Sequence, residues 1–336
     1  MRRQWFALAV ILTLAPACDN VEWGGVDVRF TSAAPRDTVP EGGAEAAQDT
    51  AAADEEKPAP RGSLLYAGLR DGARIHLSPM GDVQGDAVHP LLPVTQEPEF
   101  ADVVRYRLLA PGSEFILFAR GVRVGRAVVD TVSGTSEFCG GWPAGSGIVE
   151  LVPGAAGVDR FLALPAEAAS RRPHGTYRAL SHDYDQRVAS LRLAGEMIPQ
   201  VGARRPPSVL DSRRDIQAFT LAQYERPLIA ATFAFLDAVS VGPAPPEAYS
   251  LFVLGTPSDT VDYDAGYVLY RPVGEAGKSV PKLLDVLDLN GDGRSEIILE
   301  MFGERGRSFA SLAERGGEWL QTGEGSCGVA PPRGPR

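Results

Sequence analysis

A nine-residue stretch near the C-terminus, Asp288 to Glu296, carries the oxygen ligands that a calcium ion needs. It reads Asp-Leu-Asn-Gly-Asp-Gly-Arg-Ser-Glu. Calcium in proteins takes about six to eight oxygens from carboxylates, amides, backbone carbonyls and water. The expected ligands are the side chains of Asp288, Asn290, Asp292 and Glu296 and the backbone carbonyl of Arg294. Gly293 permits the sharp turn between them. The alternative interpretation is a solvated Asp-Gly-rich turn that binds no metal.

The residues on either side of this stretch favour strands. Leu284 and Val286 precede it, and Ile297 and Ile298 follow it, whereas an EF-hand loop lies between helices. The stretch resembles the DxDxDGxxD calcium loop of FG-GAP and VCBS-type repeats, which joins two strands. It occurs once here, whereas those families repeat it, and its Asn and Glu replace commoner aspartates. The resemblance implies a structural calcium ion that fastens two strands together.

Residues 1–17 have the layout of an export signal peptide. Arg2 and Arg3 precede an apolar segment that is too short for a permanent membrane span of about 20 residues. The following Ala-Pro-Ala-Cys, ending at Cys18, resembles the lipobox of bacterial lipoproteins, although Ala15 stands where leucine is usual. The resemblance implies that Cys18 is acylated, anchoring the chain in the cell envelope at the outer membrane or the periplasmic face. Ordinary cleavage after Ala17 is the alternative.

Cysteine usage agrees with export. The chain has three cysteines. If Cys18 carries lipid, Cys139 and Cys327 are left, and an oxidising periplasm or cell surface favours a disulfide between them. Both lie in Gly-rich segments. The alternative is two separate reduced thiols.

The charge balance restricts the partners. The chain has 33 basic and 43 acidic residues, a formal charge of -10. This balance argues against nucleic acid as a partner, because binding to phosphates needs an excess of Lys and Arg. We expect the membrane as a partner through the lipid, together with a protein or glycan partner.

Other patterns with possible chemistry are less specific. The segment from His182 to Asp185 offers His and carboxylate metal ligands, but it also suits the start of a helix, where Asp is favourable. Ser279 and Lys282 match the Ser-x-x-Lys pattern of acyl-transfer enzymes, but Pro281 breaks the helix that this motif requires. The pair Arg213-Arg214 is expected to be solvated.

The composition divides the mature chain into five segments. Residues 18–31 form the lipidated N-terminus. Residues 32–62 lack Leu, Ile, Met, Phe, Trp and Tyr, and predict a disordered acidic tether. Residues 63–165 and 208–330 show alternating apolar runs with turn signals and predict two β regions. Residues 166–207 predict a helical connector.

The fold predicted from these patterns is mainly β, an antiparallel meander or sandwich or propeller-like sheets, with one or two short helices in the middle. The spacing predicts a helix over 183–198, ended by Pro199. Asp71-Gly72 predicts a hairpin turn. Val103 to Leu109 is predicted to be a strand that pairs with 114–119.

These observations predict an exported, membrane-anchored lipoprotein that presents a calcium-stabilised β domain for binding or envelope structure, without catalysis. The alternative is an exported hydrolase-like enzyme whose carboxylate site the sequence does not identify. A concave pocket with paired carboxylates of shifted pKa would favour the enzyme.

Overall fold

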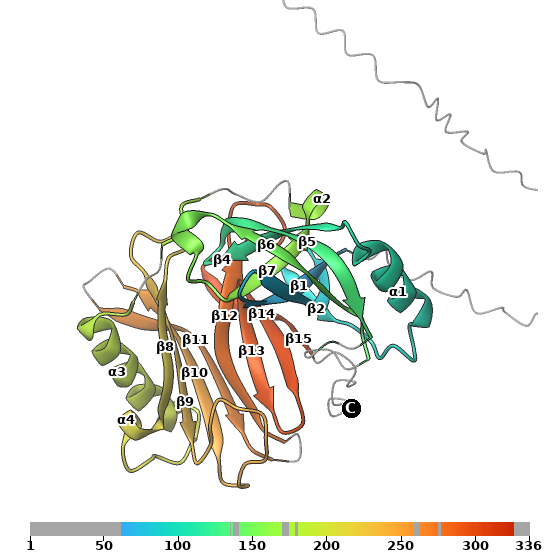
Figure 1. Ribbon diagram of the computed structural model, residues 1–336. Coiled ribbons are helices and arrows are strands. Elements are labelled where there is room, and N and C mark those ends of the chain that lie inside the picture. Colours follow the sequence, from blue (N-terminus) through green and yellow to red (C-terminus); the bar gives the residue numbers. More distant parts are fainter. Residues whose placement is uncertain are drawn as a thin grey trace, which may run out of the picture. The chain divides into compact units, whose positions relative to one another are not determined.

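The computed structural model describes residues 62–134, 136, 141–169, 175–178, 181–258, 262–274 and 277–325, which belong to one compact unit of the chain. The predicted signal peptide, Cys18 and the tether up to residue 61 lie outside these residues, as do Cys139 and Cys327. The described residues are mostly antiparallel strands with a few helices, which confirms the predicted fold class (Figure 1). None of the described helices is long and apolar enough to span a bilayer.

The N-terminal β region is a sheet that closes on itself. It contains β1 (Ser63–Asp71), β2 (Arg74–Gln84), β3 (Ala87–Pro90), β4 (Glu114–Ala119), β5 (Val122–Ser133), β6 (Ala144–Leu151) and β7 (Arg160–Pro165). The order is β1-β7-β4-β5-β6-β2-β3, and closure results because β1 also pairs with β2. Gly72, at a positive φ of 62°, makes the turn predicted between β1 and β2. Aromatic residues fill the interior, with the Tyr66 and Phe115 rings 4.9 Å apart edge to face.

The C-terminal β region contains two four-stranded antiparallel sheets. We call β8 (Arg213–Phe219), β9 (Leu228–Phe235), β10 (Tyr249–Pro257) and β11 (Tyr263–Pro272) the outer sheet. We call β12 (Ser279–Leu287), β13 (Glu296–Gly303), β14 (Arg307–Arg315) and β15 (Glu318–Gly325) the middle sheet.

Buried apolar clusters join these sheets into layers. Phe118 and Leu162 of the closed sheet pack with Ile298 and Phe309 of the middle sheet. The opposite face of the middle sheet packs against the outer sheet, in a cluster that includes Phe252 and Leu299. Helix α3 (Tyr184–Gln200) covers the other face of the outer sheet (Figure 1). The two predicted β regions therefore share continuous apolar interfaces.

Side chains of the outer sheet bind the free edge of β12. Gln217 Nε2, Thr232 Oγ1 and Ser250 Oγ each donate a hydrogen bond to a β12 carbonyl, at 3.0, 2.7 and 2.8 Å. The accepting carbonyls belong to Leu283, Pro281 and Ser279. Alternate carbonyls along β12 thus accept hydrogen bonds from side chains of the successive strands β8, β9 and β10. An exposed strand edge invites pairing with another chain, and these bonds satisfy part of that edge.

The predicted helix is present as α3. Asp183 caps it: its carboxylate accepts the Gln186 backbone N–H at 2.8 Å, and the Gln186 side chain accepts the Asp183 N–H at 3.0 Å. The predicted end at Pro199 is wrong, since Pro199 lies inside the last turn and the helix runs to Gln200.

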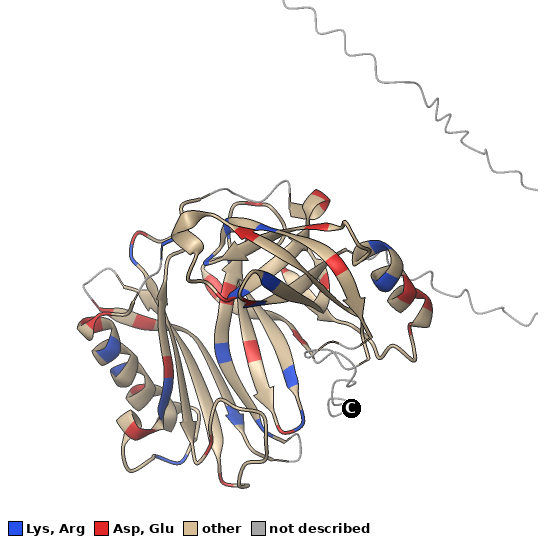
Figure 2. Ribbon diagram, viewed as in Figure 1, with Lys and Arg blue, Asp and Glu red and all other residues tan. Residues whose placement is uncertain are grey.

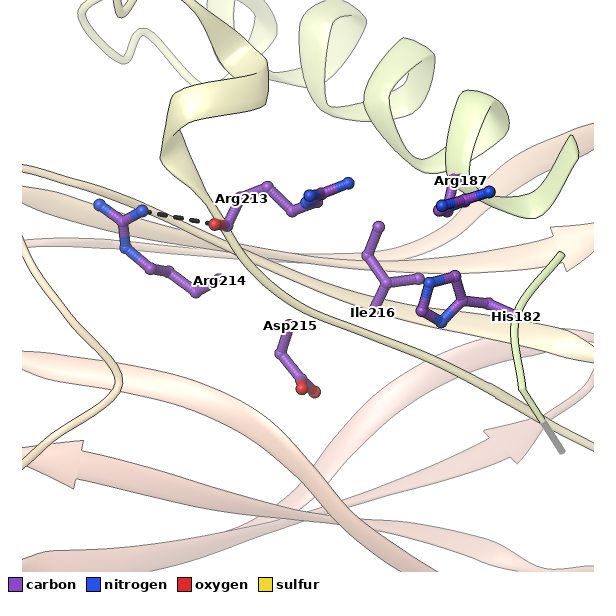
Figure 3. Close-up of a pocket in the computed structure, with 6 residues that line it drawn as sticks. All are labelled: His182, Arg187, Arg213, Arg214, Asp215 and Ile216. Atoms are coloured by element: carbon purple, nitrogen blue, oxygen red, sulfur yellow. Dashed lines mark hydrogen bonds between the residues drawn. The ribbon is translucent and has the colours of Figure 1, made fainter. Parts of the chain in front are cut away.

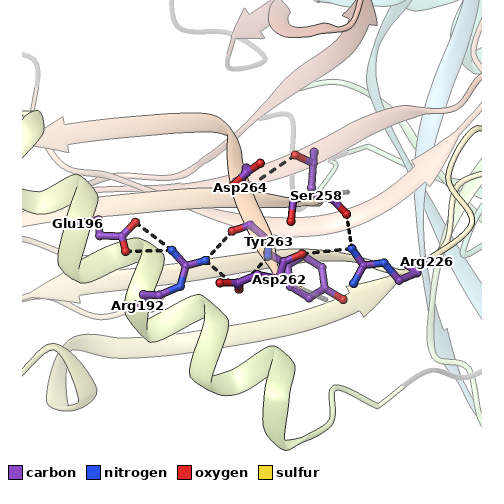
Figure 4. Close-up of polar contacts among 8 residues, drawn as sticks. Arg192, Glu196, Arg226, Ser258, Asp262, Tyr263 and Asp264 are labelled. Atoms are coloured by element: carbon purple, nitrogen blue, oxygen red, sulfur yellow. Dashed lines mark hydrogen bonds and ion pairs between the residues drawn. The ribbon is translucent and has the colours of Figure 1, made fainter. Parts of the chain in front are cut away.

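Two arginines hold the β10–β11 hairpin, one from α3 and one from the connection between β8 and β9 (Figure 4). Arg192 of the helix donates to the Asp262 carboxylate at 2.9 Å and to the Tyr263 carbonyl at 2.5 Å. Arg226 donates to the Ser258 carbonyl at 2.7 Å and stacks over the Tyr263 ring. The Arg192 contacts fix the helix on the outer sheet, and those of Arg226 join the hairpin to the β8–β9 connection.

The strand predicted over Val103 to Leu109 is wrong. This segment continues α1 (Pro98–Val103) as a π-helical turn, Val104–Leu108. Ala101 and Val104 are buried in the core of the closed sheet, while Tyr106 is exposed. The buried residues are spaced as on a helix, and that spacing outweighs the β propensity of the individual residues.

Candidate calcium-binding loop

The stretch singled out by the sequence connects two adjacent strands, β12 and β13. Leu287 and Glu296 pair across the base of this hairpin, and residues 288–295 form the loop. Gly291 and Gly293 have positive φ values of 79° and 88°, which glycine adopts without strain. The prediction of flanking strands rather than helices is confirmed.

Asp288 organises the loop from its buried end. The residue is 1% exposed, and its two carboxylate oxygens accept the backbone N–H groups of Gly291 at 2.6 Å and Gly293 at 2.9 Å. These are charge-assisted hydrogen bonds, which are stronger than neutral ones. The loop backbone is therefore wrapped around one carboxylate.

Two exposed residues continue the pattern at the tip. The Asn290 amide oxygen accepts the Asp292 N–H at 2.9 Å, and the Asp292 carboxylate accepts the Arg294 N–H at 2.8 Å. The Asn290 amide also donates to the second Asp292 oxygen at 3.1 Å. Side-chain oxygens at alternate positions thus hold the turn, as Asx motifs do.

Glu296 closes the loop from the β13 side. It is 3% exposed, and its carboxylate accepts the Leu289 N–H at 2.7 Å. Burial, together with the negative charges of Asp288 and Asp292, raises the pKa of Glu296 to about 8, against the lowering effect of the hydrogen bond from Leu289. The three carboxylates are therefore close enough to repel one another.

Arg294 ties the loop to the neighbouring strand. Its guanidinium forms an ion pair with Glu314 of β14 at 2.9 Å, and Glu314 is 11% exposed at its side chain. Gln223 donates to the same carboxylate at 3.4 Å. The loop is thus held by its side chains to the middle sheet beyond its own hairpin.

The oxygen atoms of the loop suit calcium, although the carboxylates accept hydrogen bonds from backbone N–H groups. Among the residues that the structure describes, no three His, Cys, Asp or Glu side chains are grouped as a metal centre. An ionised carboxylate has about four acceptor positions, so accepting one or two N–H bonds leaves others for a cation. A divalent ion would also neutralise the repulsion that Glu296 experiences. Asp288, Asn290, Asp292 and Glu296, with the carbonyl of Arg294, are the residues that would hold it.

A third buried carboxylate lies at the base of the hairpin and was missed by sequence reasoning. Asp285, next to a register shift in β12, accepts the backbone N–H of Arg120 at 2.7 Å and that of Val286 at 2.8 Å. Arg120 belongs to the β4–β5 turn and has a positive φ of 54°. Burial raises the pKa of Asp285 to about 7, against the lowering effect of these amides and of Arg120. Asp285 therefore joins the closed sheet to the middle sheet.

Glu300 makes a comparable connection on β13. It is fully buried, and its two oxygens pair with Arg160 of β7 at 2.7 Å and Arg307 of β14 at 3.0 Å. In the sequence, the only indication of a buried ion pair was an acidic residue within the apolar run of a strand. Its partners lie far away in the sequence, so the sequence does not identify them.

The other sequence patterns with possible chemistry either lie in ordinary structural positions or lie beside residues that are distant in the sequence. Ser279 and Lys282 lie on a strand, and Lys282 faces Asp215 at 3.6 Å. His182 precedes the α3 cap and lines a cavity together with Arg213 and Arg214 (Figure 3). No pattern in the sequence predicts that these two segments lie together.

Neither family models, nor curated proteins, nor solved structures match this chain.

Proposed function

We propose that the protein is a lipid-anchored envelope protein whose layered β module is stabilised by one calcium ion and acts by binding a protein or glycan, or as part of the envelope structure. The observation that carries this proposal is the β12–β13 loop. Two buried carboxylates, Asp288 and Glu296, face a third from Asp292 within a short turn between strands.

The position of the loop favours a structural role for calcium. The β4–β5 turn of the closed sheet lies against its base: a Cβ built on Gly121 would lie 3.2 Å from Val286 and 3.7 Å from the Ser295 hydroxyl. Leu289 is buried among apolar residues of both sheets. An ion that fixes this loop would therefore stabilise the junction of the closed and middle sheets.

The arrangement of carboxylates favours binding over hydrolysis. The two with pKa values raised to about 7 and about 8, Asp285 and Glu296, both hold backbone amides. The cavity near α3 is lined by a single carboxylate, Asp215. A hydrolase of the glycosidase type needs two carboxyl groups facing one substrate.

Thermal unfolding of the mature protein, with about 1 mM calcium and then with excess chelator, tests the calcium proposal. A ligand that binds only the folded state at 100 times its dissociation constant adds about 2.7 kcal/mol. For a domain of this size, this free energy corresponds to roughly 5–10 °C in the melting temperature. We expect the rise with calcium and no comparable rise with magnesium.

A double variant, Asp288→Ala with Asp292→Ala, is expected to lose the calcium-dependent rise. Arg126→Gln provides a control for altered surface charge, since its exposed side chain lies on β5, outside the calcium loop. If the wild-type protein melts at the same temperature with calcium and with chelator, the loop is a turn without a metal role.

The anchor rests on the signal-like residues 1–17 and on Cys18. Expression in a Gram-negative host with a labelled fatty acid tests it. We expect label on the wild-type chain and its recovery in the membrane fraction. Cys18→Ser should lose both; label that survives this substitution would show that Cys18 is not the acylated residue.

A further inference from the structure

A cavity of about 290 Å³ opens between the start of α3 and β8, an edge strand of the outer sheet (Figure 3). It is lined by His182, Arg187, Arg213, Arg214, Asp215 and Ile216. Small-molecule pockets usually measure about 300–1,000 Å³. The cavity is slightly smaller than this range, so it suits only a small ligand, and it lies on a different sheet from the calcium loop.

The cavity is basic, although the protein as a whole is acidic. Three guanidinium groups line it against one carboxylate, and charges of both signs are otherwise interspersed over the fold (Figure 2). Asp215 is already engaged: Gln217 donates to it at 2.7 Å, and Lys282 lies 3.6 Å away. Figure 3 shows the Asp215 carboxylate on the opposite side of the strand from Arg213, Arg187 and His182. The side of the cavity that faces α3 is therefore positive.

The three arginines differ in their partners. Arg214 is held as part of the wall, because it donates to the backbone carbonyls of Asp237, Asp211 and Arg213 at 3.0, 2.7 and 3.3 Å. Within the described residues, the guanidinium of Arg213 has no hydrogen-bond or ion-pair partner. Among the same described residues, the guanidinium of Arg187 makes a ring contact with Tyr184 at 5.9 Å and no hydrogen bond or ion pair.

The local backbone explains how these groups meet. The β8–β9 pairing shifts register between Arg213 and Asp215, and such an irregularity redirects side chains at a sheet edge. The Asp183 cap fixes the first turn of α3 and with it His182 and Arg187. Ile216, buried in the cluster beneath the helix, supplies an apolar surface between them (Figure 3).

We propose that this cavity binds a small oxyanion, a phosphate or carboxylate group, between the guanidinium groups of Arg187 and Arg213, with His182 as a further hydrogen-bonding group. Guanidinium presents paired N–H donors that match the geometry of both groups. Ile216 would contact a short apolar part of the ligand. The proposal is independent of the calcium loop and of the lipid anchor.

Isothermal titration calorimetry of the mature protein at low salt tests this site, with inorganic phosphate and succinate as probes. Phosphate is titrated without calcium, with which it precipitates, and succinate is titrated with and without calcium. We expect saturable binding of one equivalent of at least one probe, with a dissociation constant of about 1 mM or lower. Tighter binding of phosphate would identify a phosphomonoester as the ligand class, and tighter binding of succinate a dicarboxylate.

Arg213→Gln and Arg187→Gln should each weaken binding by about tenfold or more, because each removes charge-assisted hydrogen bonds. Arg107→Gln, an exposed arginine beside the closed sheet, makes the same charge change elsewhere and should leave the dissociation constant unchanged. Circular dichroism and the calcium-dependent melting shift should match the wild-type protein in all three variants.

Two results would overturn the proposal. One is that neither probe binds at concentrations up to about 20 mM, at which even weak oxyanion sites fill. The other is that Arg107→Gln weakens binding as much as Arg213→Gln, which would show a general charge effect rather than a site.

Discussion

The acidic β12–β13 loop and the basic cavity near α3 each bring several groups of like charge together, but they differ in burial and in hydrogen bonding. In the loop, Asp288 and Glu296 are buried, and their oxygens hold backbone amides of the same short turn. In the cavity, Arg213 is exposed and brought to its neighbours by distant segments of the chain. The loop carboxylates therefore stabilise the fold, whereas the guanidinium group of Arg213 is accessible to a ligand.

This difference predicts unequal costs of substitution. Changes in the loop should lower the free energy of unfolding, because they leave buried N–H groups without an acceptor. Changes in the cavity should alter binding and leave stability almost unchanged.

The largest effect is expected from Asp288→Ala. It removes the acceptor of two charge-assisted bonds at a residue that is 1% exposed, and should cost about 3 kcal/mol or more in urea unfolding without calcium. Asp288→Asn keeps one acceptor oxygen and should cost less. If the alanine variant is as stable as the wild type, the loop carboxylates do not stabilise the fold as we propose.

Titration of Asp285 should make the free energy of unfolding depend on pH. Its pKa is raised by burial from the usual 3.8 to about 7 in the folded protein, so the folded state retains a proton that the unfolded state has released. The resulting stabilisation is present at low pH and is lost as the pH rises through 7. Between pH 5 and pH 8, the loss amounts to about 2–3 kcal/mol.

Asp285→Asn keeps an acceptor for the Arg120 and Val286 amides and carries no titrating proton. The difference in unfolding free energy between variant and wild type should therefore grow in favour of the variant from pH 5 to pH 8. Urea unfolding at several pH values measures this difference. A difference that does not change with pH would show that Asp285 titrates in its usual range.

A smaller effect is expected where the outer sheet binds the edge of β12. Thr232→Val removes the hydroxyl that donates to the Pro281 carbonyl at a residue that is 1% exposed, and should cost about 1–2 kcal/mol. Thr232→Ser keeps the hydroxyl and should restore the hydrogen bond while losing a methyl group. If both variants lose the same stability, packing rather than the hydrogen bond is responsible.

The smallest effect on stability is expected from Arg213→Gln, within about 0.5 kcal/mol, as is usual for exposed residues without structural partners. Its effect should appear in oxyanion binding. A loss of stability similar to that of Asp288→Ala would show that Arg213 supports the fold, and the contrast between the two regions would fail.

The sequence predicts what is local in the chain. The strand–loop–strand geometry around Asp288 follows from neighbouring apolar runs, and the start of α3 follows from its Asp183 cap. The Val103–Leu109 segment was predicted wrongly because β-favouring residues there also have helical spacing, and burial decided between the two.

The sequence does not predict what depends on distant pairing. Closure of the first sheet requires β1 to find both β2 and β7, and no residue type signals that order. The contact between Asp285 and Arg120, the ion pairs of Glu300 and the cavity near α3 arise in the same way. These sites exist only after distant segments of the chain have packed together.

We propose that the β12–β13 loop binds one calcium ion. Equilibrium dialysis of the mature protein against about 1 mM calcium, with the bound metal measured by mass spectrometry, tests it directly. We expect one calcium per chain in the wild type and none in the double variant Asp288→Asn with Asp292→Asn. Wild-type protein that holds no calcium, or a variant that holds as much as the wild type, would contradict it.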